Sequence, residues 1–301
     1  TEYLQGVDYV IEGNIIKLTE NSRIKSYEYE DIYPSSYTNA GSLRKRVSGG
    51  YIYCPEGLFF HNGQLAVTYK HEADATFVGA EYQGDKLASL NSKLAKGEDV
   101  NVLLYGDSIS VGANVSGKTG GAPWLPIYGK YFSTLLSEKT GSKVNFINQS
   151  KSGQTSVWGA ENASAKISGQ NPDLLIIAFG MNDGSFGVSL EDFEASVRSI
   201  ISTAKSLYPE CDIVLISTTL PNDEVYQSDG KTLFMGTHRE QPAVLSRIAQ
   251  DTGAAFVNVT AIHEKLLENK RFVDMTGNNT NHPNDFLARM YVQALMKTVT
   301  E

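Results

Sequence analysis

After its first hundred residues the chain alternates between short apolar segments and amphipathic segments, and this alternation limits the possible folds more than any other feature. The apolar segments are rich in β-branched residues and end at glycine or polar residues, as buried strands do. We expect strands at residues 100–105, 143–148, 174–179, 213–217 and 255–258. Helical spacing of apolar side chains occurs in residues 125–139, 189–207, 238–251 and 283–299. This order predicts a three-layer α/β/α domain with about five parallel strands.

Residues 1–98 have a different pattern. Six short segments rich in β-branched and aromatic residues are separated by Gly, Asn and Asp, which predicts a small all-β, sandwich-like accessory domain. The segments are residues 9–11, 14–18, 51–53, 57–60, 65–69 and 75–79. Residues 84–98 carry leucines at helical spacing and are expected to form a connector. The predicted domains are therefore residues 1–98, with the connector, and residues 99–301.

Tyrosine is frequent in the predicted β-domain. These side chains either form a surface that stacks on sugar rings or fill and edge the β-core. The second interpretation is favoured, because tyrosine is a common strand residue. The tyrosines concerned are Tyr27, Tyr29, Tyr33, Tyr37, Tyr51 and Tyr53.

Charge and hydropathy argue against two classes of partner. Acidic residues outnumber basic ones by 34 to 26, the net charge is −8, and no basic run exceeds three residues, which argues against a nucleic-acid partner. No apolar stretch approaches the roughly 20 residues of a membrane helix, so we expect a soluble protein without a membrane partner. The two cysteines, Cys54 and Cys211, form neither a disulfide framework nor a thiol metal site. Secreted and cytoplasmic locations both remain open, as does the oligomeric state.

Ser108 follows the first predicted strand of the α/β domain, within Gly106-Asp107-Ser108. A serine at the carboxyl end of a buried strand lies where open α/β sheets bind ligands. The same tripeptide is also an ordinary turn, in which Ser108 would only cap the next helix. Three further motifs, each after a strand or before a helix, favour a chemical role.

Two of these motifs supply hydrogen-bond donors. Gly153 follows the second predicted strand, and its backbone N–H is a candidate donor to an oxyanion, although a turn that needs positive φ also explains a glycine. Asn182 follows the third strand, level with Ser108, and its side-chain amide is a second candidate donor. Asn182 is equally suited to a turn.

The last motif is a histidine at the junction between a loop and the final predicted helix. His282 precedes Pro283, which suits the first turn of a helix. A serine hydroxyl is a poor nucleophile until a base removes its proton, so Ser108 requires an imidazole of this kind. Capping of the helix is the alternative role of His282. The other four histidines lack such a context.

The four motifs, taken together over about residues 99–301, resemble the sequence blocks of the SGNH, or GDSL-type, hydrolases. The resemblance implies a flavodoxin-like fold and ester hydrolysis without a metal or an organic cofactor. It implies that Ser108 is the nucleophile, that His282 is the general base and then acid, and that Ser108, Gly153 and Asn182 form the oxyanion hole. The arrangement of a β-domain before such a hydrolase resembles that of some bacterial carbohydrate esterases, which remove acetyl groups from plant polysaccharides such as xylan. The blocks are Gly106-Asp107-Ser108, Gly153, Gly180-Met181-Asn182-Asp183 and His282.

One position departs from the family pattern. The family has an acidic residue three positions before the histidine, where its carboxylate orients the imidazole, whereas this chain has Asn279. An amide orients a ring but carries no charge. Our hypothesis is a Ser-His dyad in which a backbone carbonyl or Asn279 holds the imidazole. Asp183, Asp274 and Asp285 remain possible substitutes for the acid.

The sequence constrains the substrate less than it constrains the type of reaction. Trp124, in a glycine-rich loop after Ser108, either contacts a sugar or an acyl chain or anchors the next helix. The residues after Ser108 are mostly Gly, Asn, Ser and Lys, which favours a small acyl group such as acetyl on a carbohydrate. One alternative is a lipase, lysophospholipase or thioesterase with an apolar groove. The other is a catalytically weak carbohydrate-binding protein, since fold does not guarantee function.

Overall fold

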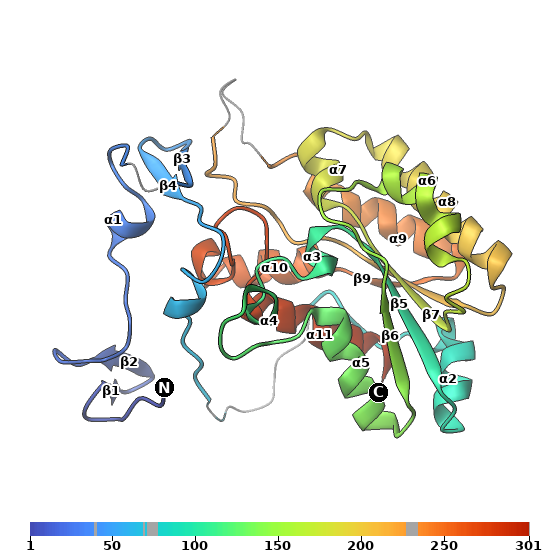
Figure 1. Ribbon diagram of the computed structural model, residues 1–301, viewed down its shortest axis with the longest axis horizontal. Coiled ribbons are helices and arrows are strands. Elements are labelled where there is room, and N and C mark those ends of the chain that lie inside the picture. The colour runs from blue at the N-terminus through green and yellow to red at the C-terminus, as the bar shows by residue number, and fades with distance from the viewer. Residues whose placement is uncertain (39–40, 69, 71–77, 227–233, 301) are drawn as a thin grey trace.

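The computed structural model describes residues 1–38, 41–68, 70, 78–226 and 234–300 (Figure 1). Its centre is a sheet of five parallel strands in the order β6-β5-β7-β8-β9, which is the flavodoxin-like order. The sheet and its five predicted strands are confirmed. The strands are β5 (Val100–Gly106), β6 (Val144–Asn148), β7 (Leu174–Ala178), β8 (Asp212–Ile216) and β9 (Ala255–Val257).

Helices cover both faces of the sheet, as expected (Figure 1). Successive side chains of a strand point to opposite faces, so Val102 and Leu104 lie in one apolar core while Leu103 and Tyr105 lie in the other. The first core is covered by α2 (Ala88–Ala95), α5 (Tyr128–Thr140), α10 (Val259–Leu267) and α11 (Asp285–Val299). The second is covered by α6 (Ser156–Ile167), α8 (Leu190–Leu207) and α9 (Gln241–Thr252).

The sequence pattern misses two of these helices and the role of a third. Helix α6 presents small residues such as Gly159 and Ala163 to the core, so its apolar periodicity is weak, and α10 begins directly after β9. Helix α2 falls in the expected connector, but its Leu90 and Leu94 are buried in the core that β5 shares. The position of the domain boundary stays a prediction.

Short helices lie between the larger elements. Helix α3 begins immediately after β5, and α7 follows β7, so both start at the carboxyl edge of the sheet. Among the residues described, no helix combines the length and the apolar character needed to cross a membrane. The short elements are α3 (Ser108–Val111), α4 (Ser116–Thr119), α7 (Met181–Phe186) and the single-turn 3₁₀ helices η2 (Gly84–Lys86), η3 (Thr237–Arg239) and η4 (Phe272–Asp274).

Residues 1–68, which we call the front segment, contain antiparallel strands as predicted, but in a different arrangement. They form two separate two-stranded sheets, which lie apart in Figure 1, instead of one sandwich. Strands of three or four residues bury too little surface to build a sandwich of their own. The elements are β1 (Tyr9–Glu12), β2 (Ile15–Leu18), α1 (Tyr29–Ile32), β3 (Leu43–Lys45), β4 (Tyr51–Tyr53) and η1 (His61–Gly63).

The expected strands of this region are only partly present. Three of the six segments form β1, β2 and β4, while β3 was not expected. Residues 57–60 form a turn and residues 65–68 are irregular. Residues 69 and 75–77 lie outside the described residues, and residues 78–79 form a turn.

The second half of the front segment packs on the α/β domain. Ile52 in β4 is fully buried against Val225, which belongs to the loop after β8. The backbones pair at the same place, because Val47 N donates to Glu224 O at 2.9 Å and Tyr226 N donates to Lys45 O at 2.8 Å. This part of the front segment is therefore stabilised by contacts with the α/β domain.

The tyrosines mostly pack against other aromatic rings. Tyr27 stacks on Phe59 with ring centroids 4.5 Å apart, and Tyr53 meets the same ring edge-on at 4.8 Å. Tyr29 and Tyr37 are more than 60% exposed. The arrangement favours the structural interpretation for Tyr27 and Tyr53, since both rings are partly buried and pack on the ring of Phe59.

Replacing Ile52 by alanine should test the packing of the front segment. We expect Ile52→Ala to lower the free energy of unfolding by about 2–5 kcal/mol, because it leaves a cavity at a fully buried site. The matched control is Ile16→Ala in the exposed β2, which should cost well under about 1 kcal/mol. Denaturant titration of both variants measures the difference, and equal losses would contradict the packing described.

Candidate active site

Ser108 lies at the carboxyl end of β5, at the first residue of α3. The turn is sharp because the carboxylate of Asp107 caps the helix by accepting a hydrogen bond from Ile109 N at 2.9 Å. A Cβ at Gly106 would lie 2.4 Å from the carbonyl oxygen of Ala178, so β5 and β7 approach this closely only because residue 106 is glycine. The local sequence thus fixes Ser108 at the sheet edge.

His282 reaches Ser108 from the loop before α11. Its Nε2 lies 2.9 Å from Ser108 Oγ. The loop is closed by Gly277 N and Thr276 Oγ1, which both donate to His282 O at 2.9 Å. Asn284 ends the loop by capping α11 through the N–H groups of residues 286 and 287. The structure therefore brings together the two residues that the sequence singles out as nucleophile and base.

The environment of the imidazole favours its neutral form. Burial lowers the pKa of His282, because the surrounding protein solvates the imidazolium poorly. The negative charge of Glu56 acts in the opposite direction and raises this pKa. A neutral imidazole whose Nε2 faces a hydroxyl is the form that accepts a proton.

The two other expected donors lie at the same edge of the sheet. Gly153, with φ of +75°, is in the loop after β6, and Lys151 N of that loop donates to Gly106 O at 3.0 Å. Asn182 is in the first turn of α7, directly after β7, and its Nδ2 donates to Gln154 O at 2.8 Å. The second hydrogen of that NH₂ group remains for another acceptor. Oxyanion binding by Gly153 and Asn182 stays a prediction.

The other imidazole nitrogen meets a group of residues that the sequence does not reveal. Asn114 Oδ1 lies 2.6 Å from His282 Nδ1, and Asn278 Nδ2 lies 3.1 Å from it. Glu56 accepts hydrogen bonds from both amides, through Oε2 from Asn114 Nδ2 at 2.8 Å and through Oε1 from Asn278 Nδ2 at 3.2 Å. No local motif marks Glu56 or Asn114, because their relation to His282 arises only in the folded chain.

The expectation that Asn279 or a backbone carbonyl holds the imidazole is wrong. Asn279 has a left-handed backbone with φ of +56° and turns its side chain toward the front segment. There its Nδ2 donates to Tyr53 O at 3.1 Å, and its Oδ1 accepts from Asn222 Nδ2 at 3.2 Å. The group that faces the Nδ1 atom of the ring is instead the side chain of Asn114.

The three aspartates considered as substitutes for the acid are engaged elsewhere. Asp183 accepts hydrogen bonds from Ser156 N at 2.9 Å and from Ser156 Oγ at 2.6 Å. Asp285 accepts from Ser116 N at 2.8 Å. Asp274 forms an ion pair at 3.0 Å with the arginine three positions before it. The first two aspartates thus link separate helices, whereas the contact of Asp274 lies within one turn.

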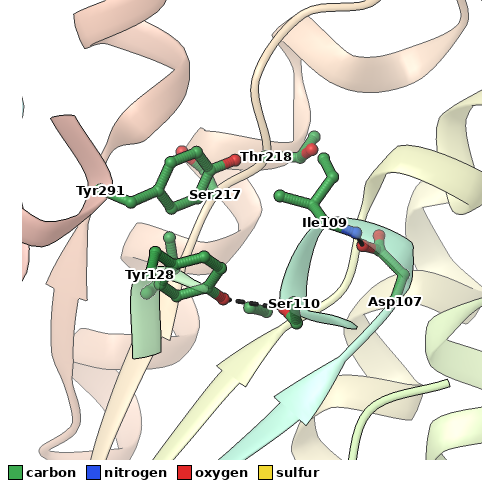
Figure 2. Close-up of a pocket in the computed structure, with 9 residues that line it drawn as sticks. Asp107, Ile109, Ser110, Tyr128, Ser217, Thr218 and Tyr291 are labelled. Carbon is green, nitrogen blue, oxygen red and sulfur yellow. Dashed lines mark hydrogen bonds between the residues drawn. The ribbon is translucent and has the colours of Figure 1, made fainter. Parts of the chain in front are cut away.

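A small cavity is lined by Asp107 and Ile109, the two neighbours of Ser108 in the sequence, and by residues of the first core such as Tyr128 and Tyr291 (Figure 2). In it Ser110 Oγ and Tyr128 OH share a hydrogen bond of 2.8 Å, and the ring of Tyr291 stacks on that of Tyr128. Burial raises the pKa of Asp107 to about 7. The lining residues are Asp107, Ile109, Ser110, Tyr128, Ala178, Ile216, Ser217, Thr218 and Tyr291, so this cavity is separate from the Ser-His pair.

Trp124 is exposed and does not act as a buried anchor. Its side chain is 66% exposed, in the loop between α4 and α5. The backbone of this loop approaches the front segment, since a Cβ at Gly121 would lie 2.5 Å from Leu58 Cδ2. Contact of Trp124 with a substrate stays a prediction. Within the described residues, no group of three His, Cys, Asp or Glu side chains is arranged to hold a metal ion.

Comparisons with known proteins find a matching family and several similar proteins. The sequence pattern of the GDSL-like Lipase/Acylhydrolase family matches residues 104–288, more than half of the chain. Thioesterase 1/protease 1/lysophospholipase L1 of Escherichia coli (strain K12) is 30% identical over 109 residues, which cover 36% of this chain and 47% of that protein. The chain therefore spans about half the length of the curated relatives it matches.

Two solved structures share the fold. A two-domain esterase (CEX) active on acetylated mannans, co-crystallized with mannopentaose, has a TM-score of 0.56 and 21% identity, over 72% of this chain and 55% of that chain. A catalytic mutant of an acetylxylan esterase from Geobacillus stearothermophilus has a TM-score of 0.53 and 20% identity, over 66% of this chain and 94% of that chain.

The buried carboxyl group of Asp107 should make stability fall as pH rises. The pKa of Asp107 is about 7 in the folded protein and about 3.9 in an unfolded chain. The folded state therefore holds a proton that the unfolded state releases between these two pH values, and this contribution to stability is lost as pH rises through 7.

The Asp107→Asn variant tests this prediction, because its side chain keeps an acceptor for Ile109 N but does not titrate. From about pH 5 to about pH 8, the free energy of unfolding of the variant should gain about 2–3 kcal/mol relative to wild type. Denaturant titrations at both pH values measure this, and a constant difference would contradict it.

Proposed function

The chain belongs to the GDSL-like lipase/acylhydrolase family, and so to the carboxylic ester hydrolases, and we propose that it hydrolyses acetyl and other small acyl esters of carbohydrates. The observation that carries the proposal is the distance of 2.9 Å between Ser108 Oγ and His282 Nε2 at the carboxyl edge of the sheet. A hydroxyl and a neutral imidazole in this contact form a nucleophile with its general base.

In the proposed reaction, Ser108 Oγ attacks the ester carbonyl while its proton passes to His282 Nε2. The carbonyl oxygen becomes an oxyanion, which accepts hydrogen bonds from the N–H groups of Ser108 and Gly153 and from Asn182 Nδ2. Collapse of the intermediate breaks the bond to the alcohol, which takes the proton from the imidazolium, and leaves an acyl-serine. Water then gives a proton to His282 Nε2 and attacks the acyl carbonyl. The second intermediate breaks its bond to Ser108 Oγ, which takes this proton back from the imidazolium, and the acid is released.

Two observations support a small acyl group on a carbohydrate. The two fold relatives described above are named for activity on acetylated mannans and on acetylxylan. The side chain of Trp124 is exposed in the loop that follows α4, and an exposed indole is a surface on which a sugar ring stacks.

A preference for long acyl chains is the second candidate function. The name of the curated relative, which includes lysophospholipase and thioesterase, supports it. A third possibility, a carbohydrate-binding protein with little activity, is disfavoured because the Ser-His contact is intact. The length of the acyl chain distinguishes the first two candidates.

Hydrolysis of p-nitrophenyl acetate, butyrate and octanoate should decide between these functions. We expect the highest kcat/KM with acetate, and a loss of at least about 10³-fold in Ser108→Ala because the nucleophile is removed. Ser110→Ala is the control, since it removes a hydroxyl of the same helix that bonds to Tyr128 and not to the imidazole. Rising activity toward octanoate would favour the lipid candidate. Full activity of Ser108→Ala would contradict the proposed site.

The pH dependence of kcat/KM should report the titration of His282. Because burial lowers the pKa of His282, the imidazole remains a free base at pH values where an ordinary histidine is protonated. The activity should therefore fall on the acid side with a midpoint below about 6.5, the ordinary histidine pKa. A midpoint above this value would show that the protein favours the imidazolium instead.

A further inference from the structure

Glu56 links the front segment to the imidazole of His282. It lies between β4 and η1, and although the residue is exposed, both of its carboxylate oxygens accept hydrogen bonds from buried amides. These amides belong to Asn114 and Asn278, the two side chains next to His282 Nδ1. Glu56 is thus one amide away from the ring, on the side opposite Ser108.

The carboxylate of Glu56 fixes which way the Asn114 amide points. A carboxylate only accepts hydrogen bonds, so Asn114 must turn its NH₂ group toward Glu56 and its oxygen toward His282. An amide oxygen also only accepts, so a proton on Nδ1 satisfies the shorter contact of this nitrogen, 2.6 Å to Asn114 Oδ1. The other neighbour, Asn278 Nδ2, lies 3.1 Å from Nδ1 but has other acceptors for both of its hydrogens. Nε2 is then the unprotonated nitrogen that accepts the proton of Ser108 Oγ.

Asn278 is held in one orientation by independent contacts. Its Oδ1 accepts from the backbone N–H groups of Thr280, Asn281 and His282, each at 3.1 Å. Its Nδ2 therefore faces Glu56 Oε1 at 3.2 Å and Asn281 Oδ1 at 3.4 Å, which accept its two hydrogens, and it also lies beside His282 Nδ1. The carboxylate therefore receives one hydrogen bond from each of two amides that cannot rotate freely.

The backbone of Asn114 is also held in place by the front segment. His61, buried in η1, has its Nε2 2.8 Å from Asn114 O. Asn114 has a left-handed backbone with φ of +60°, and a Cβ at Gly277 would lie 2.5 Å from its Cβ. Glu56 and His61 thus hold the side chain and the main chain of the same asparagine.

We propose that Glu56 is a positioning residue for the Ser108–His282 pair, acting through Asn114 to select the reactive tautomer and to balance the charge of the imidazolium. It supplies, from the front segment and across an amide, the negative charge that the family pattern has three positions before the histidine. During the reaction the proton of Ser108 moves to Nε2, the Nδ1 proton stays in its hydrogen bond to Asn114, and Glu56 remains a carboxylate.

The inference rests on the proposed roles of Ser108 and His282, and Glu56→Gln tests it. We expect kcat for p-nitrophenyl acetate to fall roughly 10- to 100-fold with little change in KM, because the imidazole loses its fixed orientation. The acid midpoint of kcat/KM should also move to lower pH, because a negative charge that favours the imidazolium is lost. The matched control is Glu224→Gln, which removes another carboxylate between the front segment and the α/β domain, bonded to Arg46 and Ser48.

A second substitution separates positioning from folding. In the Glu56→Gln variant, the additional change Asn114→Asp places a carboxylate directly against His282 Nδ1. This carboxylate can accept one hydrogen bond from the Nδ1–H group of the ring and another from the side-chain amide at position 56. We expect this double variant to recover most of the lost kcat and to return the acid midpoint toward its original pH. Loss of a merely structural contact would not be repaired by a charge at residue 114.

A spectroscopic measurement makes the test independent of activity. The ¹⁵N chemical shifts of His282 should show the Nδ1–H tautomer in the wild-type protein and a larger Nε2–H fraction in Glu56→Gln. Unchanged kcat, midpoint and tautomer in Glu56→Gln would overturn the inference, as would equal losses in Glu224→Gln without a shift of the midpoint. Failure of the proposed function gives a different result, namely full activity of Ser108→Ala.

Discussion

The hydrogen bond between Ser108 Oγ and His282 Nε2 joins residues that are 174 positions apart, and the chemistry of the site depends on keeping them together. On one side, β5 ends at a glycine that lets β7 pack closely, and Asp107 caps the helix that begins at Ser108. On the other side, the loop of residues 276–282 is closed on itself and leads into the capped start of α11. The large apolar cores hold these two ends at a fixed separation.

The opposite side of the imidazole depends on residues outside the α/β domain. Asn114 is bound by Glu56 and His61, which both belong to the front segment. That segment is in turn held by the burial of Ile52 against Val225. Packing of the front segment is thus coupled to the orientation of the His282 ring. Through this coupling the front segment contributes to the site independently of any contact with substrate.

The sequence predicts the sheet and the Ser-His pair, but not the surroundings of the pair. Buried parallel strands such as β5 and β7 are continuous apolar runs, so their pattern is visible without tertiary information. Ser108 and His282 stand in local motifs beside such elements. Glu56 and Asn114 have no local signature, since their contact spans 58 positions and the contact of Asn114 with His282 spans 168. The strands of the front segment are equally hard to predict, because contacts such as Ile52 with Val225 stabilise them.

The amide between Glu56 and His282 has an energetic consequence. A carboxylate buried directly against the imidazole would interact strongly with the imidazolium, but removing it from water costs several kcal/mol. Glu56 stays exposed at the surface, while Asn114 carries its orienting effect into the protein. The charge interaction is weaker across this distance, because it falls with separation and is screened near the surface. Burial of His282 consequently outweighs Glu56 and lowers the pKa of the ring, which keeps the base free of a proton before the reaction begins.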